Sequence, residues 1–307
     1  MRSLLAVLVL VAGSAVQAFD SEAWLRRRAD FAAAAERMTA AYEKCAAAVD
    51  APAENLLIPV ESWPDGSVKT SVAASAAQLF LAEGLVWGRG VTVRRFREDG
   101  SEDGTIRAED CVIDRNRRAG WTKGLATFAF GRETTVSGRG VYFDLGERYL
   151  SIASETTVVR GDDRLTGERG CYDHARGVVM FEGSVAFSHR VGGDVYDIGS
   201  DRAWAFIEGT NSLRRVVALG GVAIKGAGRR GGAARAVYTA GDGKLVLYGD
   251  GDSPAWLEQT GERAGRLEGR SIAYWTKSGQ VEVLGALVSV NAEGAKLPGG
   301  KGGGHGR

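Results

Sequence analysis

The sequence predicts an all-β protein in which repeated antiparallel strand units stack into an elongated body, preceded by one N-terminal α-helix. Glycine accounts for 44 of the 307 residues, whereas proline accounts for only 5. This combination is typical of many turns between short strands. A tyrosine–glycine–glycine phrase also recurs in the second half of the chain. Around it, apolar and polar side chains alternate with the period of two that a strand requires.

Residues 1–18 have the pattern of a secretory signal peptide. Arg2 precedes an apolar run over Leu4–Val11, and the small residue Ala18 precedes the expected cleavage point. The run is too short to span a bilayer. Phe19 stands where a lipoprotein would carry a cysteine. We therefore expect an exported, soluble protein from which the signal peptide is removed; an uncleaved anchor is the alternative.

Residues 19–50 are predicted to form an amphipathic helix, because they are rich in alanine and contain neither glycine nor proline. Trp24, Phe31, Met38 and Cys45 recur every seven residues and form one apolar stripe. The stripe packs either against the chain's own strands or against a partner or a membrane surface. The helix is also a candidate cap for one end of a stack of strands.

The three cysteines do not form a disulfide framework, because an odd number leaves at least one thiol unpaired. We expect Cys45, Cys111 and Cys171 to have packing roles, since a free cysteine behaves as a small buried apolar residue.

The tyrosine–glycine–glycine phrase has the same spacing in its three clearest copies. They are Tyr172, Gly177 and Gly183; Tyr238, Gly243 and Gly249; and Tyr274, Gly279 and Gly285. Weaker copies lie around Val112, Tyr142 and Trp204, and the period is 30 to 36 residues. We interpret each copy as a strand ending at the tyrosine, a tight turn at the first glycine, and a second strand that bends at the second glycine. Such units stack and share one continuous core.

Alternation along these strands assigns one apolar row to the interior. The opposite row carries polar residues such as Glu182 and Lys225, although Met180 interrupts it. The apolar row comprises Val179, Phe181, Val185, Phe187, Val216, Val222, Ile224, Leu245, Leu247, Val281 and Val283.

This pattern resembles the LptA/OstA family of periplasmic proteins of lipopolysaccharide export, to which LptC is related. The resemblance lies in the segments ARAVYTAGDGKLVLYG, GRSIAYWTKSGQVEVLG, VVALGGVAI and MFEGSVAF, and it extends over roughly residues 68–290. It implies a twisted β-jellyroll, with a first OstA-like region at 51–160 and a second at 161–291. The chain is longer than a single domain of that family, and its predicted helix has no counterpart in the family's bridge protein.

The resemblance also implies a function. The chain would be a periplasmic component of lipopolysaccharide transport that binds acyl chains of lipopolysaccharide or a similar glycolipid. The apolar row named above would line the groove, where each buried methylene contributes about 0.8 kcal/mol. The end strands would pair edge to edge with other jellyroll transport proteins.

A structural or adhesive β-solenoid with a sealed core is the alternative function, because a lipid groove and a dry core share the same alternation. A solenoid of this kind would cap both ends with polar faces. The tail at 292–307 is rich in glycine and lysine and is expected to be disordered.

We expect no enzymatic activity, cofactor or metal, because the chain lacks the spacing of HExxH, paired CxxC and GxSxG motifs. Its histidines are His174, His189 and His305. The segment RGDDR at Arg160–Arg164 is interpreted as a solvated turn. The net charge of +1 gives no indication of a nucleic-acid partner.

Three groups of basic residues have two interpretations: solubilising charge balanced by nearby acids, or contacts for lipid phosphates at a groove rim. The groups are Arg94, Arg95 and Arg97; Arg115, Arg117 and Arg118; and Lys225, Arg229 and Arg230.

Overall fold

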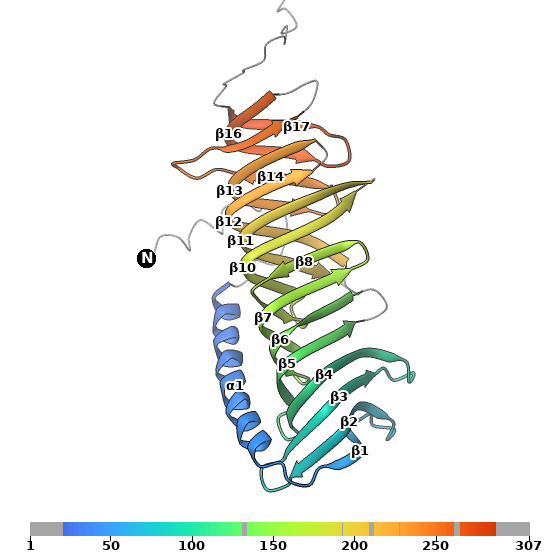
Figure 1. The fold of residues 1–307 in the computed structure, drawn as a ribbon. Coiled ribbons are helices and arrows are strands. Elements are labelled where there is room, and N and C mark those ends of the chain that lie inside the picture. Colours follow the sequence, from blue (N-terminus) through green and yellow to red (C-terminus); the bar gives the residue numbers. More distant parts are fainter. Residues whose placement is uncertain are drawn as a thin grey trace, which may run out of the picture.

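The computed structural model describes residues 21–130, 134–191, 193–208, 212–226, 228–260 and 265–286. The expected signal peptide at 1–18 and the expected disordered tail at 292–307 lie outside the described residues. The described chain forms one long antiparallel sheet preceded by a single helix (Figure 1). This arrangement confirms the predicted fold class.

The helix, α1, covers Ser21–Ala47, and 17 strands follow it. The strands are β1 (Ala53–Ser62), β2 (Val68–Phe80), β3 (Leu85–Phe96), β4 (Glu102–Asp114), β5 (Ala119–Phe130), β6 (Thr134–Asp144), β7 (Tyr149–Arg160), β8 (Asp163–Gly167), β9 (Arg169–Asp173), β10 (Val178–Val191), β11 (Asp194–Glu208), β12 (Ser212–Gly226), β13 (Arg229–Thr239), β14 (Lys244–Tyr248), β15 (Ala255–Gln259), β16 (Gly265–Trp275) and β17 (Val281–Ala286).

The strands pair in chain order and form one continuous antiparallel ladder. At two positions of this ladder, two short strands together take the place of one long strand. β8 and β9 together lie between β7 and β10. β14 and β15 together lie between β13 and β16. The ladder continues through the expected boundary after residue 160, where Arg160 pairs with Asp163. Among the described strands, β1 pairs only with β2 and β17 only with β16, so these two are the edges.

The sheet folds back on itself because its long strands bend near their middles. Phe143 on β6 pairs with Gly120 on β5, and Phe128 lies eight residues further along β5. A straight strand would separate the two phenylalanines by about 26 Å, yet their ring centroids are 6.3 Å apart. Gly120 permits this fold, because a Cβ atom there would stand 2.2 Å from the Phe143 ring.

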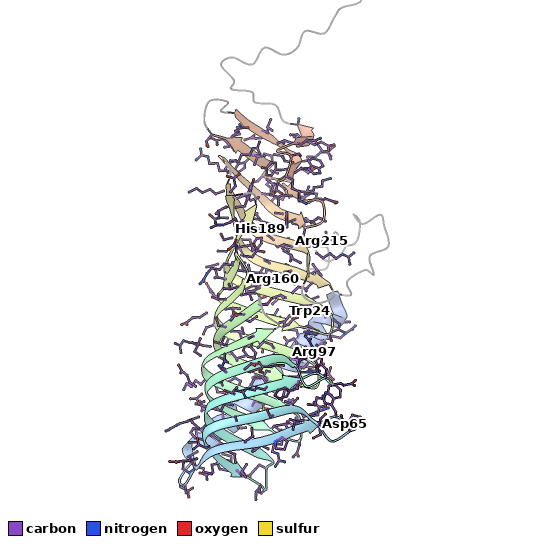
Figure 2. The ribbon with its side chains drawn as sticks, turned by 90° about the vertical axis from the view of Figure 1, so that its right-hand side faces the viewer. Trp24, Asp65, Arg97, Arg160, His189 and Arg215 are labelled. Atoms are coloured by element: carbon purple, nitrogen blue, oxygen red, sulfur yellow. The ribbon has the colours of Figure 1, made fainter. Side chains whose placement is uncertain are left out.

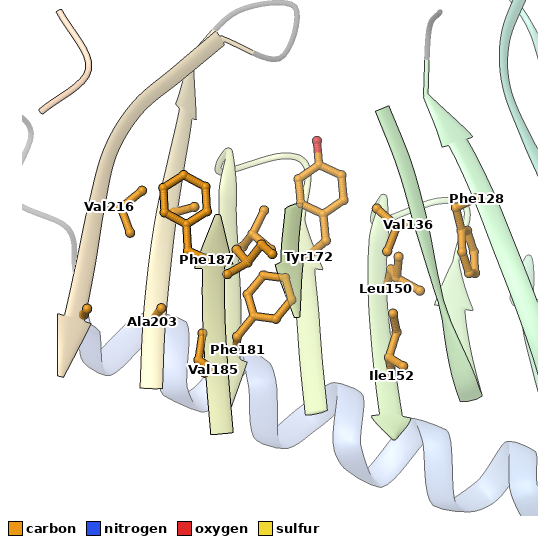
Figure 3. Packing of buried hydrophobic residues seen from close by; sticks show 14 of the residues in the cluster. Phe128, Val136, Leu150, Ile152, Tyr172, Phe181, Val185, Phe187, Ala203 and Val216 are labelled. Atoms are coloured by element: carbon orange, nitrogen blue, oxygen red, sulfur yellow. The ribbon is translucent and has the colours of Figure 1, made fainter. Parts of the chain in front are cut away.

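The bend divides the sheet into two walls that face each other across a common core. The strand halves next to the turns at 81–84, 115–118, 145–148 and 174–177 form the wall that carries α1, and we call it the helix wall. The other halves, such as Val185–Val191 of β10, form the open wall. Inward side chains from both walls fill the space between them (Figure 3).

Helix α1 lies along the outer face of the helix wall, beside the stack of strands (Figure 1). Its predicted stripe of Trp24, Phe31, Met38 and Cys45 is buried, and it packs on aromatic and aliphatic residues of β3 to β10. The Phe31 ring stacks on Tyr149 with centroids 3.8 Å apart. The helix therefore packs on its own sheet, as the first of the expected alternatives stated, and it does not cap an end of the stack.

The same contact explains an irregularity in the predicted alternation. Met180 points outward from β10, where a polar residue is expected on an exposed face. The residue is 2% exposed because it belongs to the cluster that α1 covers. Ion pairs fix the helix at this level: Arg28 donates two hydrogen bonds to Glu182, at 3.2 and 2.6 Å.

The repeated glycines have the positions that the sequence predicts, with one exception. The first glycine of each copy, Gly177, Gly243 or Gly279, is in a turn with positive φ. The second glycine bends its strand at Gly183 (φ 76°) and at Gly285 (φ 64°). At Gly249 the expected bend is wrong, because β14 ends there and β15 begins six residues later. A Cβ atom at Gly249 would stand 2.5 Å from the Ser253 carbonyl oxygen, so the break also requires glycine.

Candidate functional site

The residues of the predicted apolar row lie together between the two walls. Nine of them are buried, and Phe181 and Leu247 have no exposed surface. Val281 and Val283, near the β17 edge, are partly buried against the same cluster. Figure 3 shows Phe181, Val185, Phe187 and Val216 within this interior. Their inward orientation is thus observed, while their contact with a lipid stays a prediction.

The interior also extends through the first half of the sheet, which the predicted row did not include. Val93, Phe128, Val136 and Ile152 are among its buried members. The weaker repeat around Tyr142 was the signal for this region, because the same alternation is legible on either side of it. The apolar interior therefore extends along most of the stack.

A small cavity lies in this interior, between β6, β7, β9 and β10. Its volume is about 40 Å³, and its lining includes Val136, Leu150, Ile152, Val179 and Phe181. An apolar cavity of about 150 Å³ holds one benzene molecule. The cavity is therefore too small for an acyl chain, and a chain would enter only if the walls moved apart.

The two walls meet along a line that we call the seam, defined by Glu61, Arg118, Arg148, His174, His189, Tyr196, Arg229, Tyr238 and Tyr274. The contacts that cross the seam join strands that are not neighbours in the ladder, whereas Arg148 and His174 contact each other within the helix wall, beside the paired strands β7 and β9. The hydroxyls of Tyr196 on β11 and Tyr274 on β16 lie 3.1 Å apart. Burial and this hydrogen bond raise the pKa of Tyr196. The ring of His189 on β10 lies 5.7 Å from that of Tyr238 on β13.

Polar contacts continue the seam toward both ends of the stack. Arg118, in the turn between β4 and β5, donates to Glu61 of β1 at 2.9 Å. Arg229 of β13 donates to the carbonyl oxygen of Gly279 at 3.4 Å, and its guanidinium lies 4.6 Å from the centre of the Tyr274 ring. The described contacts across the seam are thus made by side chains, whereas backbone hydrogen bonds hold each wall together.

Most of the basic residues that the sequence indicated are neutralised by acids. Arg95 and Arg97 lie 3.7 and 3.2 Å from Asp103. Arg117 and Arg118 pair with Asp114 and Glu61, and Arg230 pairs with Glu258. These pairs favour the interpretation as balanced surface charge. Figure 2 shows Arg97 and Asp65, which belong to turns near the β1 end of the stack.

The RGDDR segment contains one specific contact besides a turn. Gly161 has a φ of 54° and lies in the turn between β7 and β8. Asp163, the first residue of β8, lies 2.6 Å from Nδ1 of His189, so it joins the seam at that histidine.

All three cysteines are free and buried, as expected for packing roles. Burial raises the pKa of Cys171 to about 11 and also raises that of Cys111. Their thiols therefore stay protonated at neutral pH.

The two edges of the sheet expose apolar side chains. Leu57 on β1 is 69% exposed, and Leu284 on β17 is 61% exposed. Leu81, in the turn after β2, is 78% exposed. A sealed solenoid would place polar residues at such edges. Within the described part of the chain, no helix is both long and apolar enough to cross a membrane.

Comparison with known proteins gives matches to solved structures, and the one described here has low sequence identity. No protein family matches the chain as a whole or in part, and no curated protein matches its sequence. Among solved structures, the chain is similar to LptH from Pseudomonas aeruginosa, described as the LptA homologous periplasmic component of the lipopolysaccharide transport device. The identity is 16%, the match covers 54% of this chain and 90% of LptH, and the TM-score is 0.23.

Proposed function

We propose that the protein is a periplasmic component of lipopolysaccharide transport that binds the acyl chains of lipopolysaccharide, or a similar glycolipid, between its two walls. The observation that carries this proposal is a continuous apolar interior whose walls are joined at the seam by side chains. Such a seam opens without breaking the backbone ladder of either wall. The predicted row from Val179 to Val283 would then line the groove.

The proposal is supported by comparing the free energy of a seam contact with the free energy gained when an acyl chain is buried. A hydrogen bond or ion pair at the seam contributes about 0.5–1.5 kcal/mol. Burying an acyl chain of about twelve carbons contributes about 10 kcal/mol. One chain therefore offsets several seam contacts and part of the packing that is lost when the walls separate.

The edge strands suggest the partners. β1 and β17 each pair on one side only among the described strands, and each carries an exposed leucine. An edge strand with free N–H and C=O groups accepts a strand from another protein. We propose that other jellyroll transport proteins add to these edges and extend the groove.

The sealed β-solenoid remains a second candidate function, and one observation favours it. The interior is filled by packed side chains, and the cavity between β6, β7, β9 and β10 has a volume of about 40 Å³. In that case the walls never separate, and the seam contacts serve stability alone. The two functions differ in whether the interior admits a lipid.

A photocrosslinker inside the groove tests the difference. We expect p-benzoylphenylalanine in place of Phe181 to capture lipopolysaccharide in the cell envelope, because Phe181 is fully buried and lines the cavity. The matched control replaces Ala186, an exposed residue on the opposite face of the same strand. Capture is read by immunoblotting for lipopolysaccharide after irradiation.

Capture at position 181 with at most traces at 186 supports the groove. Equal capture at both positions indicates adhesion of lipid to the surface. If neither position captures lipid in a folded protein, the solenoid becomes the better account.

A further inference from the structure

Arg148 and His174 form a pair at the seam, next to the apolar cavity. Arg148 ends the turn between β6 and β7, and His174 begins the turn between β9 and β10. Nη2 of Arg148 donates to Nε2 of His174 at 2.8 Å, and the His174 amide donates to the Arg148 carbonyl oxygen at 3.1 Å. The His174 ring packs at 5.6 Å against the ring of Tyr172, which lines the cavity.

The positive charge of Arg148 is not neutralised. No carboxylate of the described residues forms an ion pair with Arg148, whereas Arg118 and Arg139 each have an acid within 3.0 Å. Asp103 acts on Arg148 only from a distance and is already paired with Arg95 and Arg97. Burial, and then the charge of Arg95, lowers the pKa of Arg148. The group is therefore a cation that lacks its counter-ion.

His174 holds the guanidinium in place and adds no charge of its own. Because arginine has no acceptor, Nε2 of His174 must accept the hydrogen bond, which is the role of a neutral imidazole. Burial, and then the charges of Arg148 and Arg95, lowers the pKa of His174. The imidazole thus stays neutral at pH 7, and the remaining donors of Arg148 are available to a ligand.

The space beside this pair is accessible. Arg148 is exposed to solvent. Arg95, which acts on both residues from the opposite wall, lines an open polar cleft of about 420 Å³ together with Trp63 and Asp103. The uncompensated arginine is thus linked to the apolar cavity through His174 and Tyr172, and to the polar cleft through the nearby charge of Arg95.

We propose that Arg148, positioned by His174 and opposed by Arg95, binds the phosphate group of an amphiphile whose hydrocarbon chain enters the cavity lined by Val179 and Phe181. The guanidinium fork matches the oxygens of a phosphate monoester or diester. This inference rests on the proposed function, because it assigns the head group of the lipid that the groove binds.

The test uses three soluble probes and calorimetric titration below the micelle concentration. Dodecyl phosphate carries both parts of the ligand, dodecyl maltoside carries only the chain, and inorganic phosphate carries only the anion. The variants are Arg148→Gln in the site, Arg139→Gln as the control of equal charge, and Val179→Phe, which fills the cavity. Arg139 pairs with Glu155 at 3.0 Å and is 46% exposed.

We expect Arg148→Gln to weaken dodecyl phosphate binding at least about tenfold, since the variant removes a charge-assisted hydrogen bond. The affinity for dodecyl maltoside should not change in this variant. Arg139→Gln should change neither the affinity for dodecyl phosphate nor that for dodecyl maltoside. Val179→Phe should lower the affinity for both amphiphiles. In an NMR titration of the wild type, dodecyl phosphate should raise the pKa of His174, because a nearby anion favours the imidazolium form.

Three results would overturn the inference, and they are distinguishable. If Arg148→Gln leaves dodecyl phosphate binding unchanged while Val179→Phe weakens it, the head-group site is wrong and the groove stands. If neither amphiphile binds the wild type, the proposed function fails together with the inference. If inorganic phosphate binds as tightly as dodecyl phosphate and loses affinity in Arg148→Gln, the site takes free phosphate rather than a lipid.

Discussion

Replacing Phe181 by alanine is expected to lower the free energy of unfolding by about 3–5 kcal/mol, the usual cost of truncating a buried phenylalanine. Phe181 has no exposed surface, and it lies in the core between the two walls (Figure 3). The truncation would enlarge a cavity that is already present beside it. Urea denaturation followed by tryptophan fluorescence measures the change.

Leu125→Ala is the matched control, because Leu125 is 38% exposed on β5. We expect that variant to lose less than about 1 kcal/mol. If the two variants lost the same free energy, the interior around Phe181 would not be packed as described.

Replacing Asp173 by alanine is expected to release α1 from the sheet. The carboxylate of Asp173 is fully buried, and it accepts from Nε of Arg27 at 3.1 Å and from Nη1 of Arg176 at 3.3 Å. Removing it leaves two arginines near an apolar interface without their shared acid. We expect a loss of about 2–3 kcal/mol, below the usual 3–5 for a broken buried pair because both arginines keep contact with water.

Hydrogen exchange shows which part of the structure loses stability in this variant. In Asp173→Ala, the amides of α1 should exchange faster, while those of β12 to β16, which α1 does not cover, should keep their rates. Glu147→Ala is the control, since Glu147 pairs with the same Arg27 but is 58% exposed. Unchanged exchange in α1 of Asp173→Ala would mean that the contacts of Asp173 do not hold the helix, and that the apolar stripe and the remaining polar contacts, such as Arg28 with Glu182, are sufficient.

Features that depend on neighbouring residues were predictable from the sequence. The seven-residue stripe from Trp24 to Cys45 predicted the helix and its buried face. The glycines at the turn tips predicted the hairpins, because positive φ at a turn favours glycine wherever it occurs. Period-two alternation predicted the inward row from Val179 to Leu247, since a strand turns every second side chain to the same face.

Features that depend on distant pairs were not predictable in this way. Alternation shows which side chains share a face, but it does not show that α1 covers the outer face at Met180. Tyr196 and Tyr274 are 78 residues apart, and neither residue type indicates the other as its partner. Arg148 was missed because isolated arginines are common on surfaces; what distinguishes it is the lack of an acid, which only the packing of the described residues shows.

If the walls separate along the seam when lipid binds, a distance across the seam must increase, and measuring it is the most direct test. Glu98, in the turn after β3, and Ala175, in the turn before β10, are exposed residues on opposite walls. Cysteines introduced at both positions accept spin labels, while the three native thiols are buried. With saturating lipopolysaccharide, double electron–electron resonance should show a longer and broader distribution of the distance between the two spin labels than without lipopolysaccharide. An unchanged distribution while lipopolysaccharide is bound would contradict the account.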